Sequence, residues 1–177
     1  REKIVRQFNT NVIGLLDVTK TVLPHFRQNK KGIIINISSI GGKMTFPLGS
    51  LYHGTKFAVE GISESLNYEV EQFGGQVRIV EPGMIATDFG GRSFDFNNDE
   101  NMTEYQNIVN ALMTAMPTMA ENASPASVVA EVIFEAATDG KNQLRYAAGE
   151  DAKMLMKNRQ QYDDATFIGG IKSQFGL

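Results

Sequence analysis

The chain has 177 residues, 42% of them hydrophobic and 21% charged, with a net charge of −3. That is ordinary composition for one globular domain, and the acidic balance excludes the basic surface of a nucleic-acid-binding protein. The absence of cysteine excludes disulfides, and with two histidines, His25 and His53, we expect no metal site. No apolar run reaches the roughly 18 residues of a membrane helix, and no signal peptide is present. We therefore expect a soluble, cytoplasmic protein.

The first part of the chain predicts a helix followed by a buried strand. Apolar residues follow helical spacing from the first turn and predict one long helix over 1–29, with Pro24 kinking it or starting a new turn. The β-branched run 33–37 is typical of a strand buried on both faces. Because the chain lacks an initiator Met and starts inside a helix, we expect it to be a fragment with its upstream part missing.

The middle of the chain repeats this order. Glycine and proline predict a loop over 38–50, and an apolar stripe predicts a second long helix over 51–73, which Gly74 and Gly75 end. A second buried strand is expected over 77–80.

The C-terminal half adds more helices and one strand. Ser124 is the expected N-cap of one of these helices, and Pro125 its first residue. The expected elements are an irregular segment over 84–101, helices over 102–116 and from Ser124 to about Thr138, a strand over 144–147, and short helices over 150–158 and 159–167. This alternation predicts an α/β fold, a parallel sheet with helices on both faces and right-handed crossovers.

Two residues at the start of the second predicted helix are candidates for proton chemistry. Tyr52 and Lys56 are four residues apart, so they share one face of the helix. An ammonium beside a phenol favours the phenolate, so we expect a lowered pKa for Tyr52. Such a tyrosine can exchange a proton near neutral pH. The spacing alone is also compatible with an ordinary surface pair.

Three further motifs accompany this pair. Asn11-Val12-Ile13-Gly14 lies within the first helix, Ser38-Ser39 follows the first strand, and Pro82-Gly83-Met84-Ile85-Ala86-Thr87 follows the second strand. In their order and spacing, these motifs and the Tyr-x-x-x-Lys pair resemble the short-chain dehydrogenase/reductase family. Residues 42–96 resemble the branch related to hydroxysteroid and retinol dehydrogenases. The resemblance implies a three-layer, Rossmann-like, doubly wound sheet, of which the chain holds the C-terminal part, as a single domain over 1–177.

The resemblance also implies the role of each site residue. The catalytic residues are Asn11, Ser39, Tyr52 and Lys56. Tyr52 is the implied general acid/base, Lys56 lowers its pKa and holds the nicotinamide ribose, and Ser39 binds the substrate oxygen. Asn11 holds a water that links Lys56 to solvent. The implied cofactor-binding residues are Asn11, Tyr52, Lys56, Pro82, Gly83, Ile85 and Thr87, of which Thr87 contacts the carboxamide.

The cofactor implied by the resemblance is NADP or NAD, with NADP slightly favoured. The family's glycine-rich phosphate loop, Gly-x-x-x-Gly-x-Gly, does not occur in the chain. It is expected upstream of Arg1, in about three β-α units or roughly 90 residues. We therefore expect the 177 residues alone to bind cofactor weakly, to present an apolar strand edge and to aggregate.

The function expected from these residues is oxidoreduction of an alcohol/carbonyl pair. A related scaffold that has lost catalysis and serves in binding or regulation is the alternative, together with an inactive fragment. A serine hydrolase built on Ser39 is disfavoured, because no Gly-x-Ser-x-Gly elbow occurs.

Two expectations concern partners. Residues 88–120 are polar and long for a connection, so we expect a substrate lid there, over an apolar small-molecule substrate. By resemblance, the helices over 1–29 and 51–73 pair with those of another subunit in a homodimer or homotetramer.

Overall fold

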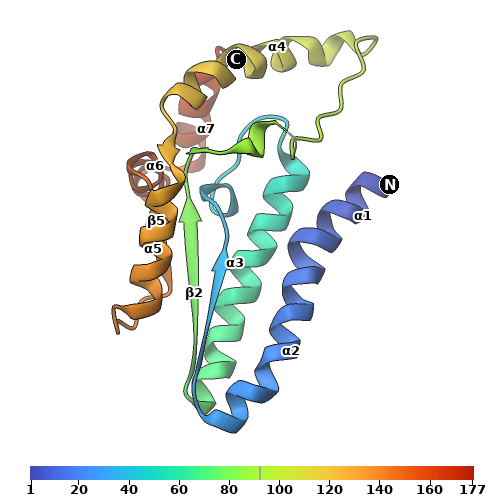
Figure 1. Ribbon diagram of the computed structural model, residues 1–177. Helices are drawn as coiled ribbons and strands as arrows, with labels where there is room; N and C mark the ends of the chain where they lie inside the picture. Colours follow the sequence, from blue (N-terminus) through green and yellow to red (C-terminus); the bar gives the residue numbers. More distant parts are fainter. Residues whose placement is uncertain (92) are drawn as a thin grey trace.

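The computed structural model describes residues 1–91 and 93–177. Three strands form a parallel sheet in the order β1-β2-β5, with β1 at Gly32–Ile37, β2 at Gly75–Pro82 and β5 at Arg145–Ala148 (Figure 1). The three expected strands are therefore confirmed, each within two residues of its expected ends. A short parallel pair, β3 (Ile85–Ala86) and β4 (Ser124–Pro125), lies beyond the end of β2.

The chain begins with α1 (Glu2–Phe8), a π-helical turn (Asn9–Ile13) and α2 (Gly14–Asn29). These follow one another without a break, so the long helix expected over 1–29 is confirmed, with Pro24 inside α2. The π-helical turn was not expected, and such turns often mark functional sites. The remaining helices are α3 (Ser50–Val70), α4 (Thr103–Glu121), α5 (Ala126–Thr138), α6 (Glu150–Gln161) and α7 (Asp164–Gln174).

Helices cover both faces of the sheet, as Figure 1 shows. On one face, Val77 packs with Leu66 and Val70 of α3 and with Leu23 of α2. On the other face, Val80 packs against α5, together with Tyr146 and Ala148. Neighbouring residues of a strand point to opposite faces, so β2 supplies both halves of the core. The predicted three-layer, doubly wound sheet is therefore confirmed.

A third apolar cluster joins the C-terminal helices to the loop that follows β1. Ile40 and Met44 of this loop pack with Phe167 and Ile171 of α7, and Leu112 of α4 lies against them. In Figure 1, α4 crosses the molecule beyond the carboxyl end of β2. Among the described residues, no helix is both long and apolar enough to cross a membrane.

Two expected helix starts are wrong. Ser124 and Pro125 form β4, and the helix begins at Ala126 with no side-chain cap. The backbone N–H of Ser124 instead donates to Met84 O at 2.9 Å. The last helix begins at Asp164 rather than 159, because the Asp163 side chain accepts the Thr166 N–H. Pairing of Ser124 with a distant strand thus determines where α5 begins, and a local side-chain cap determines where α7 begins.

The expected helix over 102–116 is longer than predicted and reaches Glu121, with Pro117 inside it. The α-helix expected over 51–73 is shorter. It ends at Val70, and a 3-10 turn continues to Phe73 before Gly74, whose φ is +80°. A left-handed residue is a common way to end a helix, and glycine adopts it without strain.

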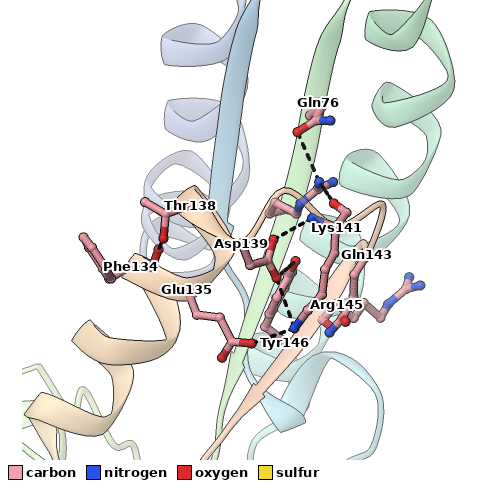
Figure 2. A network of polar contacts seen from close by, with 10 residues as sticks. Gln76, Phe134, Glu135, Thr138, Asp139, Lys141, Gln143, Arg145 and Tyr146 are labelled. Carbon is pink, nitrogen blue, oxygen red and sulfur yellow. Dashed lines mark hydrogen bonds and ion pairs between the residues drawn. The ribbon is translucent and has the colours of Figure 1, made fainter.

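A polar network closes the amino end of β5, opposite the edge where the motifs gather. Asp139, just after α5, accepts hydrogen bonds from the Tyr146 hydroxyl at 3.0 Å and the Lys141 N–H at 2.9 Å (Figure 2). Arg78 of β2 donates to Gln76 Oε1 at 3.1 Å and to the Lys141 carbonyl. These contacts tie α5, β2 and β5 together at the end of the sheet remote from the candidate site.

Candidate active site

The structure brings Ser39 and Tyr52 together. Ser39 follows β1, and its Oγ accepts the Gly41 N–H at 3.0 Å, which caps a 3-10 turn. The Tyr52 phenol lies close enough to this hydroxyl for Ser39 to lower its pKa. The Ser39 oxygen already accepts a hydrogen bond from the Gly41 N–H, so the Ser39 O–H is available to donate to Tyr52. Thirteen residues apart in sequence, these two hydroxyls form one polar pair at the carboxyl edge of the sheet.

The expected lowering of the Tyr52 pKa is not what the structure produces. Burial raises the pKa of the Tyr52 phenol above its ordinary value of 10.0, and the hydrogen bond from Ser39 offsets this only in part. Burial disfavours the charged phenolate and is the largest influence on this group. Tyr52 is thus a neutral acid in this chain, in the protonation state that a proton donor needs.

Lys56 lies beside the ring of Tyr52 rather than at its hydroxyl. Its Nζ is 5.8 Å from the ring centroid, within range of a cation–π contact. The same ammonium donates to the carbonyl oxygen of Ile37, the last residue of β1, at 3.0 Å. Burial lowers the pKa of Lys56, and the charge of Glu60 partly offsets this. The hydrogen bond fixes the charged end of Lys56 at the end of the strand.

Asn11 reaches the same helix through its neighbour. It lies in the π-helical turn, and its Nδ2 donates to Thr55 Oγ1 at 3.0 Å. Thr55 is fully buried and donates to the Tyr52 carbonyl at 2.7 Å. Asn11 is therefore connected to the turn that carries Tyr52 and Lys56. Thr55 was missed from sequence, because a threonine inside a helix carries no local signal for such a contact.

Pro82, Gly83, Ile85 and Thr87 leave the sheet beside this pair. The Gly83 N–H donates to Ala148 O at 3.0 Å, and Ile85 pairs with Ser124 across β3 and β4. The Thr87 hydroxyl accepts the Phe89 N–H at 3.3 Å, which caps a 3-10 turn. The four expected cofactor-contacting residues therefore form one segment at the carboxyl end of β2. Their role toward a cofactor stays a prediction.

One residue of the expected lid lies directly on the candidate acid. The ring of Phe89 is 5.5 Å from that of Tyr52, and Phe89 is 53% exposed. An apolar molecule bound at Tyr52 would therefore meet an aromatic wall on this side. Phe89 was missed because its neighbourhood in sequence, Thr87 to Gly91, predicts only an irregular loop.

His53 supports the loop between Ser39 and Tyr52. Its Nδ1 lies 2.9 Å from Gly41 O, and its Nε2 accepts the Phe46 N–H at 3.0 Å. The ring can satisfy both contacts only as a neutral tautomer that carries its proton on Nδ1. Burial, the largest cause, lowers the pKa of His53. Both hydrogen bonds of His53 therefore support a structural role for this residue rather than a chemical one.

Replacing His53 with alanine is expected to lower the free energy of unfolding by about 1–3 kcal/mol, since the Phe46 N–H and Gly41 carbonyl lose their partner. The unfolded chain takes up the imidazole proton near pH 6.5, and the folded chain takes it up only at lower pH. The stabilisation is therefore present above about pH 6.5 and is lost as the pH falls.

Urea unfolding at pH 7.5 and 5.5 measures this stabilisation, with His25→Ala, an exposed position of α2, as the control. An equal loss at both pH values would contradict this account.

A buried charged cluster lies one turn below Lys56. Glu60 of α3 and Glu81 of β2 are 4% and 1% exposed, and Arg145 Nε is 3.0 Å from Glu60 and 3.6 Å from Glu81. Arg145 also pairs with Glu64. Burial and then the charge of Glu60 raise the pKa of Glu81 to about 8, against the charges of Arg145 and Lys43. A proton held on Glu81 lets it donate to Glu60, which joins α3 to the sheet.

A model of the short chain dehydrogenase family matches residues 1–98, the part of the chain that contains Asn11, Ser39, Tyr52 and Lys56. The chain belongs to the short-chain dehydrogenase family. The members of this family are NAD(P)-dependent oxidoreductases, and the predicted resemblance is confirmed. An uncharacterised oxidoreductase of Schizosaccharomyces pombe is 46% identical over 176 residues, which are 99% of this chain and 73% of that protein.

Further short-chain dehydrogenases are similar to the chain in sequence or in structure. Retinol dehydrogenase 7 of Mus musculus is 30% identical over 166 residues, 88% of this chain and 52% of that protein. A solved short-chain dehydrogenase of Streptomyces avermitilis has a TM-score of 0.77 and 28% identity, over 99% of this chain and 63% of the other. The chain thus spans less than two thirds of that structure.

Two solved relatives of lower identity contain a nicotinamide cofactor. A short-chain dehydrogenase of Burkholderia cenocepacia in complex with NADP has a TM-score of 0.67 at 17% identity, over 91% of this chain and 55% of the other. One of Burkholderia phymatum in complex with NAD has a TM-score of 0.69 at 16% identity, over 86% and 54%. At these identities the likeness is one of fold.

Proposed function

We propose that the full-length protein interconverts an alcohol and a carbonyl group by hydride transfer with NADP or NAD, and that Tyr52 is its general acid/base. The observation that carries this proposal is the polar pair at the carboxyl edge of the sheet. The Ser39 hydroxyl lies close enough to the Tyr52 phenol to lower its pKa, and the Lys56 ammonium lies 5.8 Å from the same ring. In open α/β sheets this edge is where ligands bind.

The residues divide the proton chemistry between them. In the reducing direction Tyr52, protonated because it is buried, donates its proton to the carbonyl oxygen of the substrate. Ser39 donates a hydrogen bond to the same oxygen and stabilises the charge that develops on it. Lys56, one turn further along α3, places a positive charge beside the Tyr52 ring and so favours the phenolate that this transfer leaves. Asn11 and Thr55 hold this turn of the helix in place.

The residues at this edge fit a nicotinamide nucleoside, which supplies the hydride when bound. An ammonium has three N–H donors, and one of those on Lys56 bonds the Ile37 carbonyl. The others suit the hydroxyl groups of a ribose. The Thr87 oxygen accepts the Phe89 N–H, so its own proton suits a carboxamide oxygen. Pro82, Gly83 and Ile85 belong to the same segment as Thr87 and complete the proposed site.

The surroundings of Tyr52 favour an apolar substrate. The exposed ring of Phe89 stands against Tyr52, and it belongs to the 88–120 segment that we propose as the lid. The relative named retinol dehydrogenase 7 supports the same inference, since its name refers to an apolar alcohol.

The proposed assembly is a homodimer or homotetramer through α1, α2 and α3. Large apolar side chains stand exposed on these helices and on the π-helical turn between α1 and α2: Ile4, Val5, Ile13, Leu16, Val18, Leu51 and Phe57. Exposed apolar surface of this extent supports a contact with further protein.

Hydride transfer by the full-length protein tests the function. NADPH and NADH deuterated at C4 are offered with a panel of apolar ketones and aldehydes, and mass spectrometry follows deuterium into the alcohol. We expect deuterium at the carbinol carbon with at least one of the two cofactors. Binding of cofactor, read from nicotinamide fluorescence, without any transfer across the panel would favour the alternative, a binding or regulatory protein.

A further inference from the structure

The backbone just beyond Pro82-Gly83 is held from two sides by residues distant in sequence. The Met84 N–H donates to Asp151 Oδ2 at 2.7 Å, across 67 residues. The Met84 carbonyl accepts the Ser124 N–H at 2.9 Å. Met84 is therefore held through both its backbone N–H and its backbone carbonyl, which belong to the two peptide units between Gly83 and Ile85.

The carboxylate of Asp151 lies in a space made by two glycines. A Cβ atom on Gly83 would stand 2.2 Å from Asp151 Oδ2, and one on Gly149 would stand 2.6 Å from Oδ1. At these distances a side chain at either position would force the Asp151 carboxylate to move. Gly149 also has a φ of +109°, which disfavours other residues. The two glycines and the carboxylate thus fit together as one unit.

One oxygen of the Asp151 carboxylate lowers the stability of the fold. Asp151 Oδ1 is buried and, within the described part of the chain, has no hydrogen-bond partner. An unpaired buried oxygen destabilises the fold, and such groups are often retained for a function. Asp151 lies in the first turn of α6, where the helix dipole favours a negative charge and offsets part of that cost.

We propose that Asp151 is a positioning residue for the segment Pro82–Thr87. Its carboxylate sets the place of the Met84 amide, and through it the places of Ile85 and Thr87, which face the cofactor under the proposed function on which this inference rests. Helix α6, far along the chain from Tyr52, is then part of the architecture of the cofactor site. A cofactor held less firmly by this segment binds more weakly, while Tyr52 and Ser39 keep their geometry.

Hydrogen–deuterium exchange of the full-length protein without cofactor tests the positioning directly. In Asp151→Ala, we expect the backbone amides over 83–87 to exchange at least tenfold faster, with those of β2 over 75–80 unchanged. Asp151→Asn keeps an oxygen that can accept the Met84 N–H, so we expect exchange within about threefold of the wild type. Glu150→Ala, the neighbouring acid of the same helix turn, is the matched control and should change nothing over 83–87.

Kinetics supply the second readout. Asp151→Ala is expected to raise the KM for the nicotinamide cofactor about tenfold and to change kcat less than threefold. Unchanged exchange over 83–87 in Asp151→Ala, or a loss of protection spread evenly over 75–87, overturns the proposal. If Asp151→Ala does not fold, Gly83→Ala, which forces a methyl group against the carboxylate, must produce the same local loss. If the wild type transfers no hydride, the proposed function fails, and the exchange experiment still decides the role of Asp151.

Discussion

Replacing Tyr52 with phenylalanine is expected to lower the kcat of the full-length protein by about 10²–10⁴-fold, the usual contribution of a positioned general acid or base. The ring stays in place against Phe89 and Lys56, so the KM for substrate and cofactor should change little. Only the hydroxyl, whose pKa Ser39 lowers, is lost. The measurement is steady-state oxidation of NADPH or NADH with a substrate found by the deuterium assay.

The chain offers a matched control on the same helix. Tyr68 of α3 is 64% exposed, and Tyr68→Phe removes the same atom without approaching the site. Its kcat should equal that of the wild type. Thermal unfolding of Tyr52→Phe should stay close to the wild type, because a single hydrogen bond contributes only about 0.5–1.5 kcal/mol. A Tyr52→Phe enzyme with more than a tenth of the wild-type kcat would refute the assigned role.

Replacing Glu81 with glutamine is expected to remove a large pH dependence of stability. The folded protein keeps a proton on Glu81 up to about pH 8, whereas the unfolded chain releases it near 4.5. Between these values the folded state binds more protons, so the free energy of unfolding falls as the pH rises, by up to about 1.4 kcal/mol per pH unit. Below about pH 4.5 the stabilisation is fully present, and above about pH 8 it is lost.

Glutamine has the shape and neutrality of the protonated glutamate, so Glu81→Gln should match the wild type at low pH and exceed its stability at pH 8. Urea unfolding at pH 5, 6.5 and 8 gives the difference at each point. Glu69→Gln, an exposed position of α3, is the control and should follow the wild type. A difference between Glu81→Gln and wild type that is constant with pH would show that Glu81 is already ionised in the folded protein.

Features that depend on nearby residues were predictable from the sequence. Tyr52 and Lys56 share a helix face because a helix returns to the same side after four residues. The buried strands follow from short β-branched runs, and the alternation of helices and strands predicts a three-layer sheet. Ser39, Asn11 and Pro82-Gly83 were found because motif order and spacing survive in the sequence of a family member.

Features that depend on distant residues were decided by the tertiary structure alone. The Tyr52 pKa moves opposite to the prediction, because burial is its largest influence and the degree of burial depends on packing by several elements. Ser124 pairs with Met84 instead of capping a helix. Asp151 reaches Met84 across 67 residues, and Glu60, Glu81 and Arg145 meet from three different elements. Local sequence determines which functional side chains the chain carries. The fold determines where these side chains lie and which of them are protonated, because solvent exclusion and long-range contacts exist only once the layers pack.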